Sequence, residues 1–103
     1  MTITMTKFGD VLTSRQAGKE AYLAFLPTLA ELQEGEELII DFAGINTFSP
    51  SWGDEFLTPV QKQYGDRLVV KNMTNASAIL TISTLEKINC LKFRIATEKY
   101  TVV

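Results

Sequence analysis

The stretch of sequence that decides the fold is LIIDFAGINTFSPSWGDEF, which runs from Leu38 to Phe56. It begins with an apolar run typical of a buried β-strand and ends with serines and acids at the start of a helical pattern. The first backbone N–H groups of a helix lack intrahelical partners and carry a partial positive charge. A serine at such a position can cap the helix, contribute to an anion site or be phosphorylated, and this stretch leaves the three roles open.

The composition is that of one small folded domain spanning residues 1–103. A net charge of −2 without any block of like charges argues against a nucleic-acid partner. The absence of histidine and the single cysteine, Cys90, exclude Cys/His zinc sites and Ser-His-Asp or Cys-His catalysis within this chain. We expect Cys90 to be a small buried side chain. Without a signal peptide or a long apolar segment, we expect a soluble cytoplasmic protein that has no membrane partner.

Upstream of the decisive stretch, the sequence predicts one strand and one long helix. Polar and apolar residues alternate from Thr2 to Phe8, as they do in a half-buried strand. Ser14 is expected to cap a helix, and Pro27 is expected to end or kink it because proline removes a helical hydrogen bond. The predicted apolar face of this helix consists of Ala17, Ala21, Tyr22, Phe25, Leu26 and Leu29.

Downstream, helical and strand patterns alternate. A second helix begins near Ser51 and closes at Gly65, with Pro59 expected to shorten or kink it. A strand follows from Arg67 to Lys71. This alternation predicts an α/β fold, in which a small mixed β-sheet is packed by about three helices.

The third predicted helix is capped by Asn75. Its apolar face is expected to include Ile79, Ile82, Leu85 and Ile88. The segment from Phe93 to Val103 is again strand-like, with either a bulge or a strand end before Glu98.

Asp41, which ends the apolar run, has three candidate roles. It could hydrogen-bond the backbone that follows, accept a phosphoryl group as in response-regulator receivers, or bind a metal ion. The receiver chemistry requires an acidic pair near the first strand, which ends here in Phe8-Gly9-Asp10. We therefore favour the turn role for Asp41.

Two serines could cap the second helix. Ser51 with Asp54 three residues later resembles a capping box, whereas Ser49 followed by Pro50 fits a cap with proline at the first helical position. Gly53 in the first turn costs about 1 kcal/mol relative to alanine, which indicates close approach by a neighbouring element or by a partner.

Two further side chains near this helix start have alternative roles. Trp52 is either the first core residue of the helix, which its phase with Phe56 favours, or a partly exposed anchor for a partner. Arg15 follows the Ser14 cap against the preference of the helix dipole, so it is expected to be either solvated or paired with an acid. The candidate acids are Asp41, Asp54 and Glu55.

The segment from Asp41 to Leu57 resembles the strand–loop–helix of STAS domains, the fold of bacterial anti-sigma factor antagonists. With the Ser14-Arg15 helix start, it is most similar to STAS-like domains of uncharacterised function. The resemblance implies a small α/β regulatory domain that works by binding. In antagonists of that type, the unphosphorylated form docks on an anti-sigma factor with a histidine-kinase-like ATP-binding fold. Phosphorylation of a serine at this helix start releases it.

The chain departs from the family pattern at the position that would be phosphorylated. Ungapped alignment puts Pro50 at the phosphoacceptor and Ser49 at the preceding aspartate, which leaves Ser51 as the nearest hydroxyl. Asp54 and Glu55 already place negative charge in the first helical turn, where they would repel a phosphate.

We therefore predict a non-enzymatic interaction module with no metal or other cofactor. Its partner is expected to be a histidine-kinase-like ATPase or an anti-sigma factor, and its oligomeric state is left open. The predicted partner-binding residues are Ser49, Ser51, Trp52, Gly53, Asp54 and Glu55, supported by Arg15 and Asp41.

Two alternatives remain at this stage. The first is a phosphorylation-controlled switch, in which Ser51 or Ser49 accepts phosphate from a histidine-kinase-like protein serine kinase. The second is a small magnesium-dependent enzyme that uses Asp41, Ser51, Asp54 and Glu55.

Overall fold

The apolar run that opens the decisive stretch forms a central strand of the sheet. The computed structural model describes residues 1–96, and in it β3 (Leu38–Asp41) lies between β1 (Thr2–Thr4) and β5 (Leu68–Lys71). A short strand, β6 (Arg94–Ile95), pairs with β5 and completes the order β1-β3-β5-β6. These three pairings are all parallel. The α/β class is confirmed, but the described strands form a parallel sheet where a mixed one was expected.

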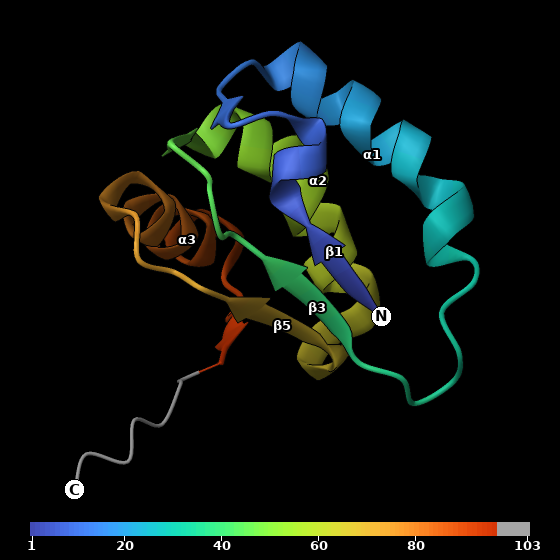
Figure 1. Cartoon of the computed structure of the whole chain (residues 1–103). Coiled ribbons are helices and arrows are strands. Elements are labelled where there is room, and N and C mark those ends of the chain that lie inside the picture. Colours follow the sequence, from blue (N-terminus) through green and yellow to red (C-terminus); the bar gives the residue numbers. More distant parts are fainter. Residues whose placement is uncertain (97–103) are drawn as a thin grey trace, which may run out of the picture.

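Three helices pack against one side of this sheet (Figure 1). They are α1 (Arg15–Leu29), α2 (Pro50–Tyr64) and α3 (Ala76–Asn89), with α2 in contact with both of the others. The helical connections explain the parallel sheet, because a strand that pairs in parallel with an earlier one needs a long crossover. None of these helices, nor any other in residues 1–96, is both long enough and apolar enough to cross a membrane.

Short elements join these larger ones. A 3₁₀ helix, η1 (Met5–Phe8), follows β1, so the predicted strand from Thr2 to Phe8 is wrong beyond Thr4. A second 3₁₀ helix, η2 (Gly65–Arg67), precedes β5. The strands β2 (Val11–Leu12) and β4 (Thr47–Phe48) form a separate parallel pair, which places the chain for the starts of α1 and α2.

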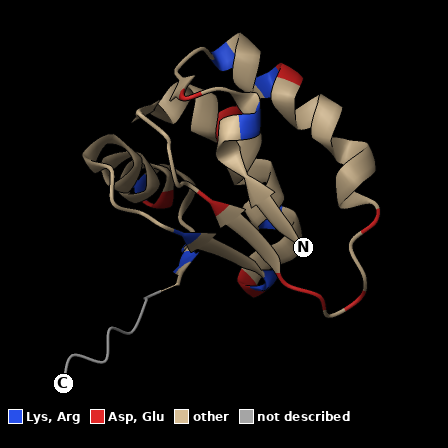
Figure 2. Cartoon of the chain, viewed as in Figure 1, with Lys and Arg blue, Asp and Glu red and all other residues tan. Residues whose placement is uncertain are grey.

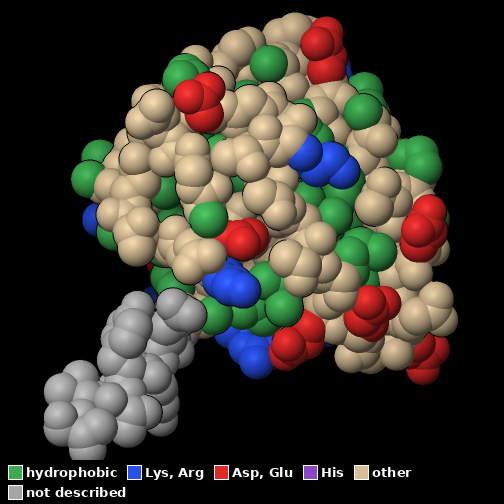
Figure 3. Space-filling view, in the orientation of Figure 1, with side chains coloured by type: hydrophobic (Ala, Val, Ile, Leu, Met, Phe, Trp, Pro, Cys, Tyr) green, Lys and Arg blue, Asp and Glu red, His purple; other side chains and the backbone are tan. Residues whose placement is uncertain are grey.

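The core lies between the sheet and the helices. Alternate strand residues, including Ile3, Ile40 and Val70, are buried toward the helices. An aromatic cluster joins α1 to α2, with the rings of Phe25 and Phe56 centred 5.4 Å apart. The opposite face of the sheet carries Ile39 and Val69 together with Thr2, Asp41 and Lys71, and Figure 3 shows hydrophobic and charged side chains scattered over it rather than one continuous apolar surface.

Neither proline ends its helix, so the expected helix end near Leu26 and the expected shortening at Pro59 are wrong. The helix α1 continues past Pro27 to Leu29, and α2 continues past Pro59 to Tyr64. Because proline has no N–H, the backbone carbonyl four residues before it lacks its helical hydrogen bond. This carbonyl belongs to Leu23 in α1 and to Glu55 in α2. Both of those residues lie at the molecular surface, where water can satisfy the carbonyl.

The apolar faces of α1 and α3 differ from the predicted ones. In α1, Ala17 and Leu26 are exposed, while Gly18 is buried. A Cβ atom on Gly18 would lie 2.5 Å from the backbone oxygen of Trp52, so the glycine allows α1 and α2 to approach closely. In α3, Ile79 and Ile88 are exposed, and the buried residues are Ala78, Thr81, Ile82 and Leu85.

The segment after α3 also corrects one expectation. Cys90 is exposed, because it ends α3 in the left-handed conformation with φ 52° and turns the chain away from the helix. Phe93 is buried and precedes β6. The rest of the predicted strand, including the bulge or strand end near Glu98, lies outside the described residues.

Candidate functional site

Ser49 caps α2 and ties its start to the neighbouring loop. Its Oγ accepts a hydrogen bond from the backbone N–H of Trp52 at 3.4 Å and donates one to the carbonyl oxygen of Thr13 at 2.9 Å. Pro50 occupies the first helical position, so the Ser49-Pro50 cap is confirmed over the Ser51 capping box. Ser51 is half-buried, and its hydroxyl has no hydrogen-bond partner within residues 1–96.

Trp52 and Gly53 belong to the core. Trp52 is only 2% exposed and contacts the rings of Phe48 and Phe56. A Cβ atom on Gly53 would lie 2.9 Å from the ring of Phe48 and 3.0 Å from Leu85 of α3, which confirms close approach by neighbouring elements. Both residues are therefore removed from the predicted binding surface, because their side of α2 faces the interior.

The two acids in the first turns of α2 are already paired. Arg15 Nη1 lies 2.6 Å from Glu55 Oε2 and 3.6 Å from Asp54 Oδ2, so of the two alternatives for Arg15 the structure shows the pairing, while its side chain stays 57% exposed. On its other side, Asp54 accepts a hydrogen bond of 3.2 Å from the side-chain amide of Asn89 in α3. These contacts neutralise the acids in part and connect the three helices.

Asp41 plays the turn role. Its Oδ1 accepts hydrogen bonds from the backbone N–H of Ala43 at 2.9 Å and from the side-chain amide of Asn72 at 2.7 Å. Asp41 makes no ion pair with Arg15, and within residues 1–96 no group of three His, Cys, Asp or Glu side chains could hold a metal ion. The structure thus separates Asp41 from the acids at the start of α2.

A groove of about 410 Å³ lies over α2, between α1 and α3. The α2 residues that line it lie on a side of the helix adjacent to the buried stripe of Trp52, Phe56 and Val60. The full lining consists of Lys19, Tyr22 and Leu23 from α1, Asp54, Glu55, Thr58, Pro59 and Lys62 from α2, and Asn89 from α3.

Most of these groove residues were not predicted. The spacing of Asp54, Thr58 and Lys62 on one helical face was a usable signal in the sequence. The contributions of α1 and α3 were not, because they depend on how the three helices cross.

The acids of the groove have ion-pair partners among the described residues, but its lysines do not. Asp54 and Glu55 are paired with Arg15, whereas Lys19 and Lys62 form no ion pair with any of the described residues. The lining of the groove therefore holds two carboxylates and two lysines, and Arg15, which is not a lining residue, pairs with the carboxylates. The groove therefore offers two lysines without an ion-pair partner among the described residues, beside two acids that are already paired.

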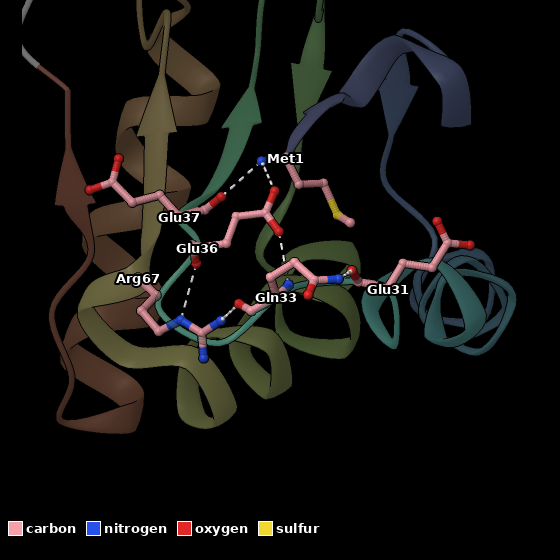
Figure 4. Close-up of polar contacts among 6 residues, drawn as sticks. All are labelled: Met1, Glu31, Gln33, Glu36, Glu37 and Arg67. Carbon is pink, nitrogen blue, oxygen red and sulfur yellow. Dashed lines mark hydrogen bonds and ion pairs between the residues drawn. The ribbon is translucent and has the colours of Figure 1, made fainter.

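A second polar cluster lies in the acidic loop between α1 and β3 (Figures 2 and 4). The Glu36 carboxylate accepts hydrogen bonds from the Met1 ammonium and from the backbone N–H of Gln33, both at 2.8 Å. The Met1 ammonium, followed by the Gln33 N–H, lowers the pKa of Glu36 below its ordinary value. Arg67 donates to the carbonyl oxygens of Glu36 and Gln33. These bonds hold the loop in place, and we assign this cluster a structural role.

Comparison with known proteins identifies the family of this chain. Residues 16–78, more than half of the chain, match the family described as "STAS-like domain of unknown function (DUF4325)". No curated protein and no solved structure matches significantly.

Proposed function

Because the chain belongs to the family of STAS-like domains of unknown function, we propose that it is a non-enzymatic module that binds a protein partner through the groove over α2. The observation that carries this proposal is the groove itself, which has a volume of about 410 Å³ and runs along the exposed part of α2 between α1 and α3. Three helices line it, and its acids are held by Arg15 and Asn89. A groove fixed in this way loses little conformational freedom when a partner binds.

The proposed binding surface keeps the accessible part of the helix start and extends along α2. Ser51, Asp54 and Glu55 remain accessible at its upper end. Leu23, with 53% of its surface exposed, supplies an apolar contact at its α1 side. We retain a histidine-kinase-like ATPase or an anti-sigma factor as the proposed class of partner, on the STAS resemblance. A binding role also agrees with a sequence that has no histidine for acid–base catalysis.

Site-specific photo-crosslinking in the native host tests this proposal. A photoreactive residue replaces Leu23 in the groove or, as a matched control, Ile79 on the outer face of α3, which is similarly exposed at 50%. We expect an adduct with one discrete protein at position 23 and none at position 79. Equal adducts at both positions, or none at position 23, would contradict docking through the groove.

The second candidate function is control of this docking by phosphorylation of Ser51. What favours Ser51 over Ser49 is that its hydroxyl has no partner within residues 1–96, while that of Ser49 is engaged by Thr13 and Trp52. A phosphate adds about −1.5 to −2 charges, one helical turn before Glu55. Arg15 would then be drawn from Glu55 toward the phosphate.

Intact-mass measurement of protein from its own host, with the Ser51→Ala variant as the control, tests this switch. We expect a species heavier by one phosphate in the wild type and its loss in the variant. Absence of that species under every growth condition would eliminate the switch and leave the docking proposal standing.

A further inference from the structure

We propose that the groove over α2 accepts an acidic amphipathic segment of the partner, which places carboxylates beside Lys19 and Lys62 and an apolar side chain against Leu23. This inference rests on the proposed docking function and specifies the chemistry of the partner.

The first argument is the balance of charge in the groove. Arg15 lies 2.6 Å from Glu55, and Asn89 donates to Asp54, so both acids already have partners from neighbouring helices. Lys19 and Lys62 stand on α1 and α2 respectively and make no ion pair with any described residue. A basic segment would have to displace Arg15, whereas an acidic segment meets two lysines that are ready to pair.

The second argument is the apolar surface between the charges. Leu23 of α1 is 53% exposed and lines the groove. Tyr22 and Pro59 are half-buried and line the groove beside Leu23. An apolar side chain from the partner would cover this patch, and burial of such area contributes roughly 25 cal/mol per Å².

The third argument is length. The α2 part of the groove runs from Asp54 to Lys62, which is about 12 Å at a rise of about 1.5 Å per residue. About two turns of a helical ligand fit alongside it, and two turns can present apolar and acidic residues at three- and four-residue spacing. The groove is therefore suited to a short amphipathic helix.

A pair of synthetic helical peptides provides the test. The two have the same leucine positions and differ only in carrying glutamate or lysine at the flanking positions. Each is titrated into the isotope-labelled full chain, and binding is followed by amide NMR shifts. We expect the glutamate peptide to bind, with the largest shifts at Lys19, Leu23 and Lys62, and to weaken as salt is raised.

Charge reversal in the protein separates the effect of the two groove lysines on peptide affinity from the effect of the protein's net charge. We expect the double variant Lys19→Glu/Lys62→Glu to bind the glutamate peptide at least about tenfold more weakly than the wild type. The matched control Lys7→Glu/Lys87→Glu makes the same change of net charge outside the groove and should retain affinity within about twofold.

Each other outcome contradicts the inference. Stronger binding of the lysine peptide at the groove would overturn the acidic chemistry while leaving groove docking intact. No binding of either peptide, or shifts confined to another face, would overturn the inference, and the crosslink at Leu23 would then decide the proposed function separately. Equal loss of affinity in both double variants would show that the peptide responds to the net charge of the protein and not to the lysines of the groove.

Discussion

Two polar clusters in this domain use the same chemistry differently. The Glu36 cluster lies where β1, β3 and β5 begin, and its Arg67 donates to two backbone carbonyls of the loop between α1 and β3 (Figure 4). The second cluster lies where α1 and α2 begin, and its Arg15 pairs with the side chains of Asp54 and Glu55. The Arg15 side chain remains 57% exposed.

The difference lies in what each arginine holds. Arg67 satisfies main-chain groups that have a fixed position, so its bonds restrain the fold. Arg15 holds acids at the rim of a groove, so its bonds set the charge that a partner meets. We therefore expect changes in the first cluster to affect stability and changes in the second to affect binding.

The largest expected effect concerns the helix contact beneath the groove. Gly18→Ala places a methyl group 2.5 Å from the Trp52 backbone oxygen, and we expect it to lower the free energy of unfolding by about 2–3 kcal/mol. Gly53→Ala is the matched comparison, because its methyl group would meet the side chains of Phe48 and Leu85, which can shift. Urea denaturation should show the greater loss for Gly18→Ala, and the reverse order would contradict the close approach of α1 and α2.

The next effect compares the two arginines directly. Arg67→Ala leaves two loop carbonyls without their donor and removes the contact with the Tyr64 ring, 5.3 Å away. We therefore expect it to lower the free energy of unfolding by about 1–2 kcal/mol. Arg15→Ala breaks an exposed pair and should cost less than about 1 kcal/mol. Thermal and urea unfolding of both variants measure the two changes in stability. A larger loss of stability for Arg15→Ala than for Arg67→Ala would contradict the structural role of Arg67 and the binding role of Arg15.

A smaller effect is the pH dependence that comes from Glu36. Because the pKa of Glu36 is lowered in the folded state, its stabilising contribution is fully present above the ordinary pKa of 4.5 and is lost as the pH falls through the folded-state pKa. The difference in stability between the wild type and Glu36→Gln should therefore be largest near neutral pH and shrink below about pH 4.

Glu34→Gln on the same loop is the charge-matched control for this measurement. We expect it to affect stability less than Glu36→Gln near neutral pH. Unfolding free energies measured across the acid range would contradict the account if the effect of Glu36→Gln grew on acidification.

The smallest expected effect concerns the exposed pair of Arg94 and Glu37. Its atoms lie 2.6 Å apart, but the two side chains are 52% and 47% exposed. We expect Glu37→Ala to change the unfolding free energy by less than about 0.5 kcal/mol at moderate salt. If Glu37→Ala lowered the unfolding free energy as much as Arg67→Ala does, an exposed ion pair would stabilise this domain as strongly as hydrogen bonds to the backbone. That result would contradict the account.

The sequence predicted the features that depend on local chemistry. Ser14, Ser49 with Pro50, and Asn75 each have a side chain that suits a helix start, and all three cap the helices that follow them. The apolar run before Asp41 was long enough to identify a central strand. These signals act within a few residues, so one sequence suffices to recognise them.

Features that depend on distant neighbours were not predictable. The strands β2 and β4 have two residues each, too few to show a periodic pattern. Pro27 and Pro59 are tolerated where their helices face solvent, and that exposure is a property of the folded molecule.

The site shows the same limit. The pairing of Arg15 with Asp54 and Glu55 was one of two alternatives that the sequence left open, whereas the hydrogen bond from Asn89, 35 positions after Asp54, was not predicted. The groove over α2 likewise exists only once three helices have packed.

The measurement that tests the central claim most directly is a charge swap between the groove and its ligand. We predict that the glutamate peptide binds the wild type more tightly than the lysine peptide does, and that Lys19→Glu/Lys62→Glu reverses this order. Reversal would locate the electrostatic recognition at these two lysines. An unchanged order of affinities in the double variant would contradict the account of the groove as a cationic docking site.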